Sequence, residues 1–345
     1  MLIDKLYETN FLARDELKQL LESNMHTPDD RLFHAARLTR ERYYGRSVYF
    51  RGLIEFSNYC KNNCYYCGIR RDNKKLNRYR LTKEEIIDCC ARGYELGFRT
   101  FVLQGGEDPY YTDEIMVDII CGMREKFPDC AITLSIGERS YDSYRSFWDA
   151  GADRYLLRHE TANYTHYKRL HPNDMSLKRR KECLYNLKQI GFQVGAGFMV
   201  GSPYQTLDTI IDDLLFLKEL EPHMVGIGPF IPHRDTPFAD RKGGTVDMTL
   251  LMLAFIRLLL PKVLLPATTA LGTIDPLGRE KGFKAGANVV MPNLSPMGVR
   301  RDYSLYNDKI YTGAEGAEGM EELKRRIVKV GLVLDQSRGD YCNWV

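Results

Sequence analysis

Eight short apolar runs, each bounded by Gly, Pro or polar residues, alternate with longer helical stretches between residues 53 and 291. This alternation is typical of βα units, in which buried strands pair in parallel. Eight such units in one chain favour an α/β fold closed as a (β/α)8 barrel, or TIM barrel. An open doubly wound sheet is the alternative topology. The predicted strands are 53–57, 100–104, 131–135, 154–158, 194–199, 224–228, 264–267 and 288–291.

Helical patterns fill the intervals between these runs. The first has a capping box, Thr82 with Glu85 three residues later. Residues 1–45 are predicted to form an N-terminal helical extension, 46–300 the barrel, and 301–345 a C-terminal segment carrying the last barrel helix. The predicted helices are 83–97, 112–127, 140–150, 176–190, 206–220, 248–260, 275–284 and 316–329.

The polar residues that follow the predicted strands indicate where a site would lie. In barrels of this kind, chemistry takes place at the carboxyl ends of the strands, where the following loops share one mouth. Three groups fall there: residues 58–60 after the first strand, 105–107 after the second and 159–161 after the fourth. We therefore expect an active site at this end.

Three cysteines, Cys60, Cys64 and Cys67, lie in the loop after the first strand. Three thiolates within eight residues can hold three corners of an iron–sulfur cubane. A structural zinc site needs four ligands, and no other Cys or His occurs between residues 35 and 88. A zinc site with a distant fourth ligand and incidental thiols are the alternatives. Three ligands on a four-iron cluster would leave one iron free to bind a reactive molecule.

This CxxxCxΦC spacing, with Tyr66 as the aromatic residue Φ, resembles the signature of radical S-adenosylmethionine (SAM) enzymes. The resemblance implies a [4Fe–4S] cluster whose open iron binds SAM, and reductive cleavage of SAM to a 5′-deoxyadenosyl radical. It also implies a set of SAM contacts. The contacts are Tyr66, Gln104, Gly105, Gly106, Glu107, Ser135, Glu160, Arg180 and Met199. Arg179 is the alternative to Arg180. From the residues alone, a plain βα turn would also explain Gly105 and Gly106.

Longer segments resemble the HydE family, the maturases of [FeFe]-hydrogenase: RGLIEFSNYCKNNCYYCGIRRDN, LQGGEDPYYT, GADRYLLRHETAN, MVGIGPFIPHRDTP, PATTALGTIDPLGRE and GANVVMPN. This resemblance implies an enzyme that helps to assemble the organometallic H-cluster from a cysteine-bound iron carbonyl and cyanide precursor. The substrate would then be a small organometallic or amino-acid molecule. The candidate lining residues are Arg158, Gln104, Met224, Thr268, Thr269, Met291, Tyr303 and Tyr306. The two methionines could equally be barrel core.

The same resemblance implies partners. A flavodoxin or ferredoxin would supply the electron, and other hydrogenase maturases would supply or accept intermediates. A basic loop near the cysteines could dock an acidic reductant, although such loops are usually only solvated. Its members are Arg70, Arg71, Lys74, Lys75, Arg78 and Arg80. Residues 311–323 contain no cysteine, so we expect no second cluster in the C-terminal segment.

Other classes are less compatible with the sequence. A net charge of +3 is too small to indicate nucleic-acid binding. The chain begins without a signal-peptide pattern and has no apolar stretch of the roughly 18 residues that cross a bilayer, so we expect a cytoplasmic protein away from membranes. Methylornithine synthase and biotin synthase are the rival radical SAM functions. An iron–sulfur electron carrier or scaffold is the rival outside this class, although a carrier would need four cysteine ligands.

Overall fold

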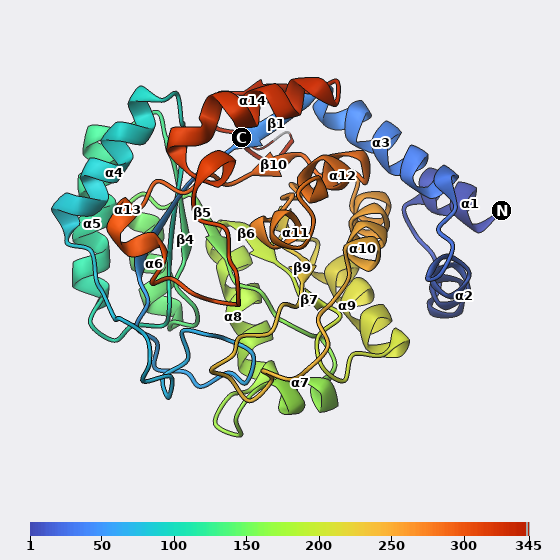
Figure 1. The fold of residues 1–345 in the computed structure, drawn as a ribbon, viewed down its shortest axis with the longest axis horizontal. Coiled ribbons are helices and arrows are strands. Elements are labelled where there is room, and N and C mark those ends of the chain that lie inside the picture. Colours follow the sequence, from blue (N-terminus) through green and yellow to red (C-terminus); the bar gives the residue numbers. More distant parts are fainter. Residues whose placement is uncertain (343, 345) are drawn as a thin grey trace.

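The strands of the computed structural model, which describes residues 1–342 and 344, form a ring of parallel pairings (Figure 1). Six strands form one sheet in the order β2-β3-β4-β5-β6-β8. Their bounds are β2 (Gly52–Ser57), β3 (Thr100–Gly105), β4 (Ala131–Ser135), β5 (Arg154–Leu156), β6 (Gln193–Ala196) and β8 (Met224–Val225). The predicted α/β barrel fold is therefore confirmed, and the open sheet is excluded by the closure described next.

The ring closes through single bridges and one further strand. Met224 of β8 bridges Leu264, and Pro266 bridges Val289 of β10 (Val289–Val290). Strand β10 in turn pairs in parallel with β1 (Ser47–Phe50), which continues into β2 after one residue. The predicted strand 264–267 is thus present as bridges to both neighbours rather than as a regular strand.

The predicted strand 194–199 is broken at Gly197. This glycine has φ +152°, and a Cβ built on it would lie 1.9 Å from the carbonyl oxygen of Gly226. Only glycine allows this close approach of two backbones. Beyond the break, β7 (Met199–Val200) pairs with β9 (Gly228–Pro229) at the mouth of the barrel.

Helices lie around the outside of the ring (Figure 1). A Ser or Thr hydroxyl accepts a backbone N–H in the first turn of six of them, α4, α5, α6, α8, α9 and α10, which is why they begin where they do. The helices that match the predicted ones are α4 (Lys83–Glu95), α5 (Asp113–Lys126), α6 (Tyr141–Asp149), α8 (Leu177–Ile190), α9 (Leu207–Leu220), α10 (Val246–Leu259), α12 (Gly278–Lys284) and α14 (Met320–Lys329).

Several further elements complete the fold. Before the barrel, residues 1–45 form α1 (Leu2–Thr9), α2 (Arg14–Asn24) and α3 (Asp30–Tyr44), and α3 packs on α10. Short elements absent from the sequence prediction are α7 (Tyr164–Leu170), α11 (Thr269–Ile274), α13 (Met297–Arg300), the 3-10 turns η1 (Gly313–Glu315) and η2 (Ala317–Gly319), and strand β11 (Val333–Asp335). Within the described part of the chain, no helix combines the length and apolar character needed to cross a membrane.

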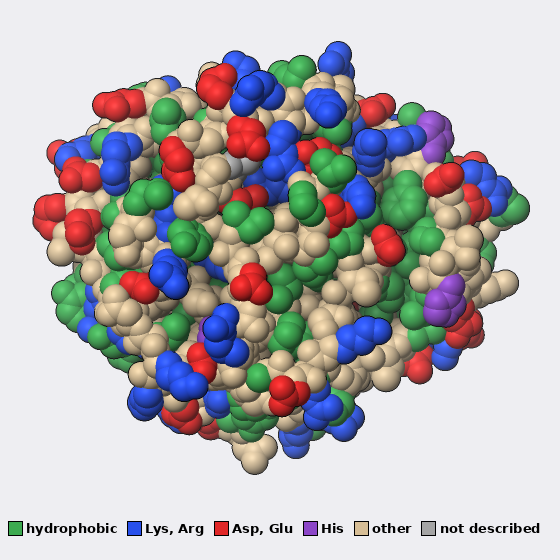
Figure 2. Space-filling model, viewed as in Figure 1, with side chains coloured by type: hydrophobic (Ala, Val, Ile, Leu, Met, Phe, Trp, Pro, Cys, Tyr) green, Lys and Arg blue, Asp and Glu red, His purple; other side chains and the backbone are tan. Residues whose placement is uncertain are grey.

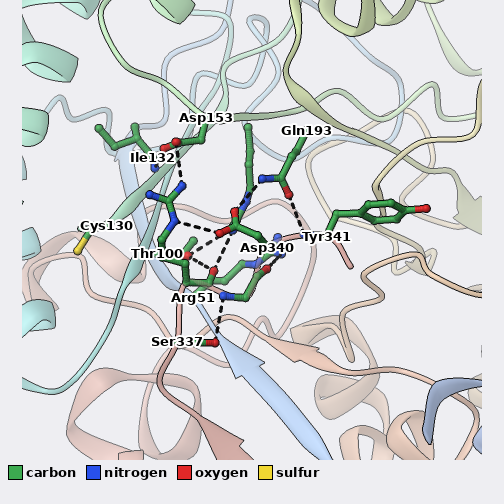
Figure 3. Close-up of polar contacts among 12 residues, drawn as sticks. Arg51, Thr100, Cys130, Ile132, Asp153, Gln193, Ser337, Asp340 and Tyr341 are labelled. Carbon is green, nitrogen blue, oxygen red and sulfur yellow. Dashed lines mark hydrogen bonds and ion pairs between the residues drawn. The ribbon is translucent and has the colours of Figure 1, made fainter. Parts of the chain in front are cut away.

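Residues 338–341 lie at the amino end of the barrel, and Figure 3 shows their polar contacts with the first residues of several strands. Strand β11 pairs in parallel with β1. Beyond it, the carboxylate of Asp340 accepts hydrogen bonds from Arg154 Nη2 and from Gln193 Nε2, each at 2.7 Å. The hydroxyl of Thr100 donates to the carbonyl of Arg338 at 2.7 Å. Because Thr100, Arg154 and Gln193 are each the first residue of a strand, this network lies at the end opposite the predicted site.

The surface in Figure 2 mixes basic and acidic side chains over most of the face that it draws. This pattern fits the small net charge of +3.

Candidate active site at the carboxyl end of the barrel

The loop after β2 brings the three predicted cysteines together. Cys60, Cys64 and Cys67 are all half-buried. Burial, and then the neighbouring Cys60 sulfur, raise the pKa of Cys67 to about 12, and burial and the other two sulfurs raise the pKa of Cys64. These thiols are therefore protonated at neutral pH in the metal-free chain, and a metal must displace their protons to bind.

No group of three or more His, Cys, Asp or Glu side chains converges on a single metal-ion position in residues 1–342 and 344. A cubane does not require such convergence, because each thiolate ligates a different iron. The donor set of three half-buried thiols in one loop is thus compatible with a cluster.

Arg78 holds this loop in shape. Its Nη2 donates to the carbonyls of Arg70 (2.7 Å) and Asn73 (3.0 Å), and its Nη1 donates to the carbonyls of Ile69 (2.9 Å) and Asn58. One guanidinium thus satisfies four backbone carbonyls of the cysteine loop. No local pattern in the sequence separates Arg78 from the other members of the basic loop.

Arg80 also has a structural role. It makes a two-pronged ion pair with Asp108, at 2.7 and 2.9 Å, and lies over the ring of Tyr59 at 3.9 Å. Lys75 pairs with Asp235 at 2.6 Å. Among the described residues, no such interior or cross-loop ion pair is found for the other members of the predicted basic loop. These are Arg70, Lys74 and Arg71, which pairs with its neighbour Asp72.

The predicted turn at Gly105 and Gly106 lies against the cysteine loop. A Cβ on Gly106 would lie 2.1 Å from the carbonyl oxygen of Tyr59 and 2.8 Å from Cys60 Cβ. The Glu107 carbonyl accepts a hydrogen bond from the Lys61 N–H at 2.9 Å. The end of β3 and the cysteine loop are therefore in direct backbone contact, which requires glycine at position 106.

Arg180 and Arg179 lie in different surroundings. The Arg180 side chain is 8% exposed, with Nε 2.8 Å from Glu138 Oε1 and Nη2 3.9 Å from Glu107 Oε1. Burial disfavours its charge, but Glu138, Tyr167 and Glu107 outweigh burial and raise the pKa of Arg180. Arg179 is exposed, and its guanidinium donates to the Arg139 carbonyl at 2.9 Å. The structure thus brings Arg180, and not Arg179, to the interior beside the cysteine loop.

Glu160 has a strained backbone. Its φ is +66°, a left-handed conformation that costs a non-glycine residue about 1–3 kcal/mol unless the surroundings enforce it. Its N–H donates to the Gly197 carbonyl at 3.0 Å. From α9, Asp213 accepts the Ala162 N–H, and Asp212 accepts from Asn163 Nδ2 at 2.8 Å. These contacts hold the loop after β5, and therefore the direction of the Glu160 side chain.

Buried polar atoms without a hydrogen-bond partner collect around these residues. In the described residues they include Arg158 Nε and Nη2, Glu160 Oε2, Tyr167 Oη and Arg180 Nε. Arg158 Nη2 is 3.1 Å from Glu160 Oε2, and Arg180 Nε is close to Glu138, but neither contact has hydrogen-bond geometry. Arginine atoms need an acceptor and a carboxylate needs a donor. A ligand with both a carboxylate and an amine or hydroxyl groups, as SAM has, fits this set.

Three further predicted cofactor contacts lie near the same loop. Met199 packs in a small apolar cluster with Tyr66 and Leu170. Gln104 and Ser135 are paired across β3 and β4 at the carboxyl ends of those strands. The structure therefore places these predicted cofactor contacts on the carboxyl side of the barrel.

The predicted substrate residues divide into two groups. Met224 is the first residue of β8, its sulfur lies 2.9 Å from Arg51 Nη1, and it packs with Tyr44 and Leu264. Met291 packs against the same cluster. The core interpretation is therefore the better one for both methionines, and Met224 lies towards the amino end of the barrel rather than at its mouth.

The remaining substrate candidates lie towards the mouth. Thr269 does not have a free hydroxyl, because it donates to Glu315 Oε2 at 2.8 Å, and Glu315 is also paired with the buried Arg279. Thr268 Oγ1 is buried without a partner in the described part of the chain. Tyr303 is buried and its hydroxyl is 3.3 Å from Gln104 Nε2. Tyr306 is half-buried.

Sequence reasoning missed a buried ion pair in this region. Glu55 of β2 is fully buried and pairs with Lys309 Nζ at 2.5 Å, while its other oxygen accepts from Asn293 Nδ2 at 2.7 Å. Lys309 also donates to the Tyr303 carbonyl at 3.1 Å. A single acid inside the apolar run LIEFS was the available signal for Glu55. Nothing in the sequence pattern indicated Lys309.

Comparisons with known proteins agree with this geometry. Residues 54–249 match the family model described as Radical SAM superfamily. The chain is 49% identical to the [FeFe] hydrogenase maturase subunit HydE of Thermotoga maritima, over 90% of this chain and 88% of that protein. It is 31% identical to 3-methylornithine synthase of Methanosarcina acetivorans, over 83% and 81%. A crystal structure of methylornithine synthase superposes with a TM-score of 0.83 at 28% identity, covering 97% of each chain.

Proposed function

Since this chain belongs to the radical SAM superfamily and, within it, to the family of the [FeFe] hydrogenase maturase HydE, we propose that it cleaves SAM reductively on a [4Fe–4S] cluster during assembly of the H-cluster. The substrate proposed is a small cysteine-bound iron complex with carbonyl and cyanide ligands. Other hydrogenase maturases would exchange intermediates with it in the cytoplasm.

When bound, the cluster and SAM supply a 5′-deoxyadenosyl radical, the reactive species of this superfamily. The chain's own residues bind and orient. Cys60, Cys64 and Cys67 would hold the cluster. Arg180 would bind the SAM carboxylate, because it is a buried cation beside the cysteine loop whose Nε makes no hydrogen bond among the described residues, although Glu138 lies close to it. Glu160 would accept from the SAM amine or ribose hydroxyls through its unpaired Oε2.

The interior of the barrel beside β2 contains a buried polar group. Lys309, Glu55 and Asn293 form this group, and Tyr303 covers it from the C-terminal segment. We propose that Thr268, Gln104, Tyr303 and Tyr306 line the substrate side of this space. Thr269 would act there only indirectly, since its hydroxyl already bonds Glu315.

The proposal rests on one observation. Beside the three thiols of the cysteine loop, buried nitrogen atoms of Arg158 and Arg180 and a buried carboxylate oxygen of Glu160 make no hydrogen bond among the described residues. The test is anaerobic reconstitution with iron and sulfide, reduction, and addition of SAM. We expect methionine and 5′-deoxyadenosine in equal amounts, and restored hydrogenase activity when the chain is supplied to a maturation system that lacks its HydE.

Methylornithine synthase is the second candidate, favoured by the structural similarity over the whole chain. The same reconstituted enzyme should be incubated with lysine. Formation of methylornithine, together with failure to mature hydrogenase, would replace the maturase proposal and leave the SAM chemistry in place.

The reductant proposed is a flavodoxin or ferredoxin. Its docking residues would be Arg70, Arg71 and Lys74, which flank the cysteine loop, because Arg78 and Arg80 are committed to internal contacts. Electron transfer from an acidic reductant should then weaken with rising salt.

A further inference from the structure

A segment outside every recognised motif lies along the cysteine loop. Helix α7 and the residues after it, 164–175, contact three consecutive residues of that loop. The Tyr65 N–H donates to the Leu170 carbonyl at 3.0 Å. The Tyr66 hydroxyl lies 3.0 Å from His171 Nε2, and Cys64 Sγ lies 3.7 Å from Met175 Sδ.

His171 has its two ring nitrogens assigned by their partners. Nδ1 lies 3.0 Å from the Tyr167 carbonyl oxygen, which can only accept, so Nδ1 carries the proton. Nε2 is therefore the acceptor, and the Tyr66 hydroxyl donates to it. Stacking of the His171 ring on the Tyr167 ring, at 4.0 Å and 24°, fixes the plane of the imidazole. The residue is 1% exposed, which favours this neutral form.

Tyr66 depends on this contact. Its ring meets that of His171 edge-on at 5.4 Å and 87°, and among the described residues His171 Nε2 is the hydrogen-bond partner found for its hydroxyl. A phenol hydroxyl carries its proton at neutral pH, so the buried Tyr66 hydroxyl is a donor that needs an acceptor. Without His171, a buried donor would be left unpaired between the cysteine loop and Glu160.

We propose that His171 is a positioning residue for SAM: by accepting from Tyr66 while bonded to α7, it fixes the part of the cysteine loop that forms one wall of the SAM pocket. The inference rests on the proposed function, in which SAM binds beside the cysteine loop, and on Tyr66 being one of the SAM contacts that the sequence predicts. It gives the segment 164–175 a role in SAM binding that is separate from the roles of the cysteine motif, the glycine turn and Arg180.

The experiment replaces His171 by two amide side chains, each of which takes the place of a different ring nitrogen. H171N keeps a donor at the Nδ1 position and loses the Nε2 acceptor. H171Q keeps an acceptor near Nε2 and loses the Nδ1 donor. SAM affinity is measured by calorimetry on anaerobically reconstituted protein, with iron content and the electron paramagnetic resonance spectrum of the reduced cluster recorded with and without SAM. H223N, at the amino end of the barrel, is the matched histidine control.

We expect H171N to retain about four irons but to bind SAM about tenfold more weakly, and H171Q and H223N to stay within about threefold of the wild type. Adding Y66F to H171N should recover affinity, because no buried hydroxyl is then left unpaired. Wild-type SAM affinity in H171N, or equal loss in H171N and H171Q, would overturn the proposal, as would loss of iron in both. Failure of the wild-type protein to bind SAM would instead refute the proposed function.

Discussion

At the residue scale, identical side chains differ in what surrounds them. Cys60, Cys64 and Cys67 share one half-buried loop, whereas Cys89, Cys90, Cys130 and Cys183 are buried in the core. The spacing of the first three was enough to separate them in the sequence. The spacing of arginines was not, because Arg78, Arg179 and Arg180 differ only in the direction that the fold gives them.

We predict that reconstitution loads about four irons per chain, the content of one cubane. Replacing Cys60, Cys64 or Cys67 by Ala should abolish SAM cleavage, because each would remove one iron ligand. C121A, an exposed cysteine, is the control and should keep full activity. Iron analysis and 5′-deoxyadenosine formation are the measurements. An active C64A variant would contradict the cluster assignment, and about eight irons would reveal a second cluster.

We predict that R180A binds SAM about ten- to a hundredfold more weakly, since loss of one charge-assisted contact costs about 1.5–3 kcal/mol. R179A is the matched control, because its guanidinium bonds a surface carbonyl, and it should bind SAM normally. Calorimetric titration of the reconstituted variants is the measurement. If R179A weakens binding and R180A does not, the carboxylate contact lies at position 179.

At the element scale, the sequence predicted the eight strand positions and the long helices, because the spacing of apolar residues and the capping residues can be read within a short stretch of chain. It missed α7 and β11. Helix α7 has seven residues, too few for a periodic pattern, and its N-cap Asn163 is also a common turn residue. Strand β11 has three residues and exists only by pairing with β1, far away in the sequence. The residues that position the site from α7 were therefore beyond sequence reasoning.

The contact between the end of β3 and the cysteine loop gives a prediction at this scale. In G106A, the added methyl group would lie about 2 Å from the Tyr59 carbonyl, so the cysteine loop must move. We expect lower iron retention and weaker SAM binding. G298A, where a Cβ meets nothing within 4 Å, is the control and should match the wild type. Normal iron content and SAM affinity in G106A would show that the two elements separate without cost.

At the scale of the whole molecule, the barrel is closed at its amino end by its own C-terminal residues and carries its candidate site at the other end (Figures 1 and 3). Arg154 is fully buried there, and Asp340 is its carboxylate partner. Met224, which the family resemblance suggested as a pocket residue and which could equally be core, packs near Arg51 towards this end. A strand pattern identifies barrel-facing residues but does not by itself say how deep in the barrel each one lies.

We predict that D340N lowers the free energy of unfolding by about 3 kcal/mol, because it leaves the buried Arg154 without a countercharge. Denaturant unfolding is the measurement. D149N, which breaks an exposed pair with Arg145, is the control and should change stability by about 0.5 kcal/mol or less. Equal effects of the two substitutions would show that the C-terminal closure adds no stability.

The Asp340 carboxylate also makes the free energy of unfolding depend on pH. Burial alone would raise the pKa of Asp340, but Arg154 and the Gln193 amide outweigh it and lower the pKa to about 2 from 3.8. A lowered folded pKa means that the stabilisation is complete above about pH 4 and is lost as pH falls towards 2. The stability difference between wild type and D340N should therefore shrink over that interval, and a constant difference would contradict this account.

Strand β1 has both of its partners, β10 and β11, near the far end of the chain. A ribosome adding about 5–20 residues per second finishes β1 roughly 15–60 seconds before it reaches β11. Until β10 is made, β1 lacks both of these partners, although β2 can already pair with β3. Closure of the ring is therefore a late event in synthesis, because β1 has a strand on both edges only after β11 has been made.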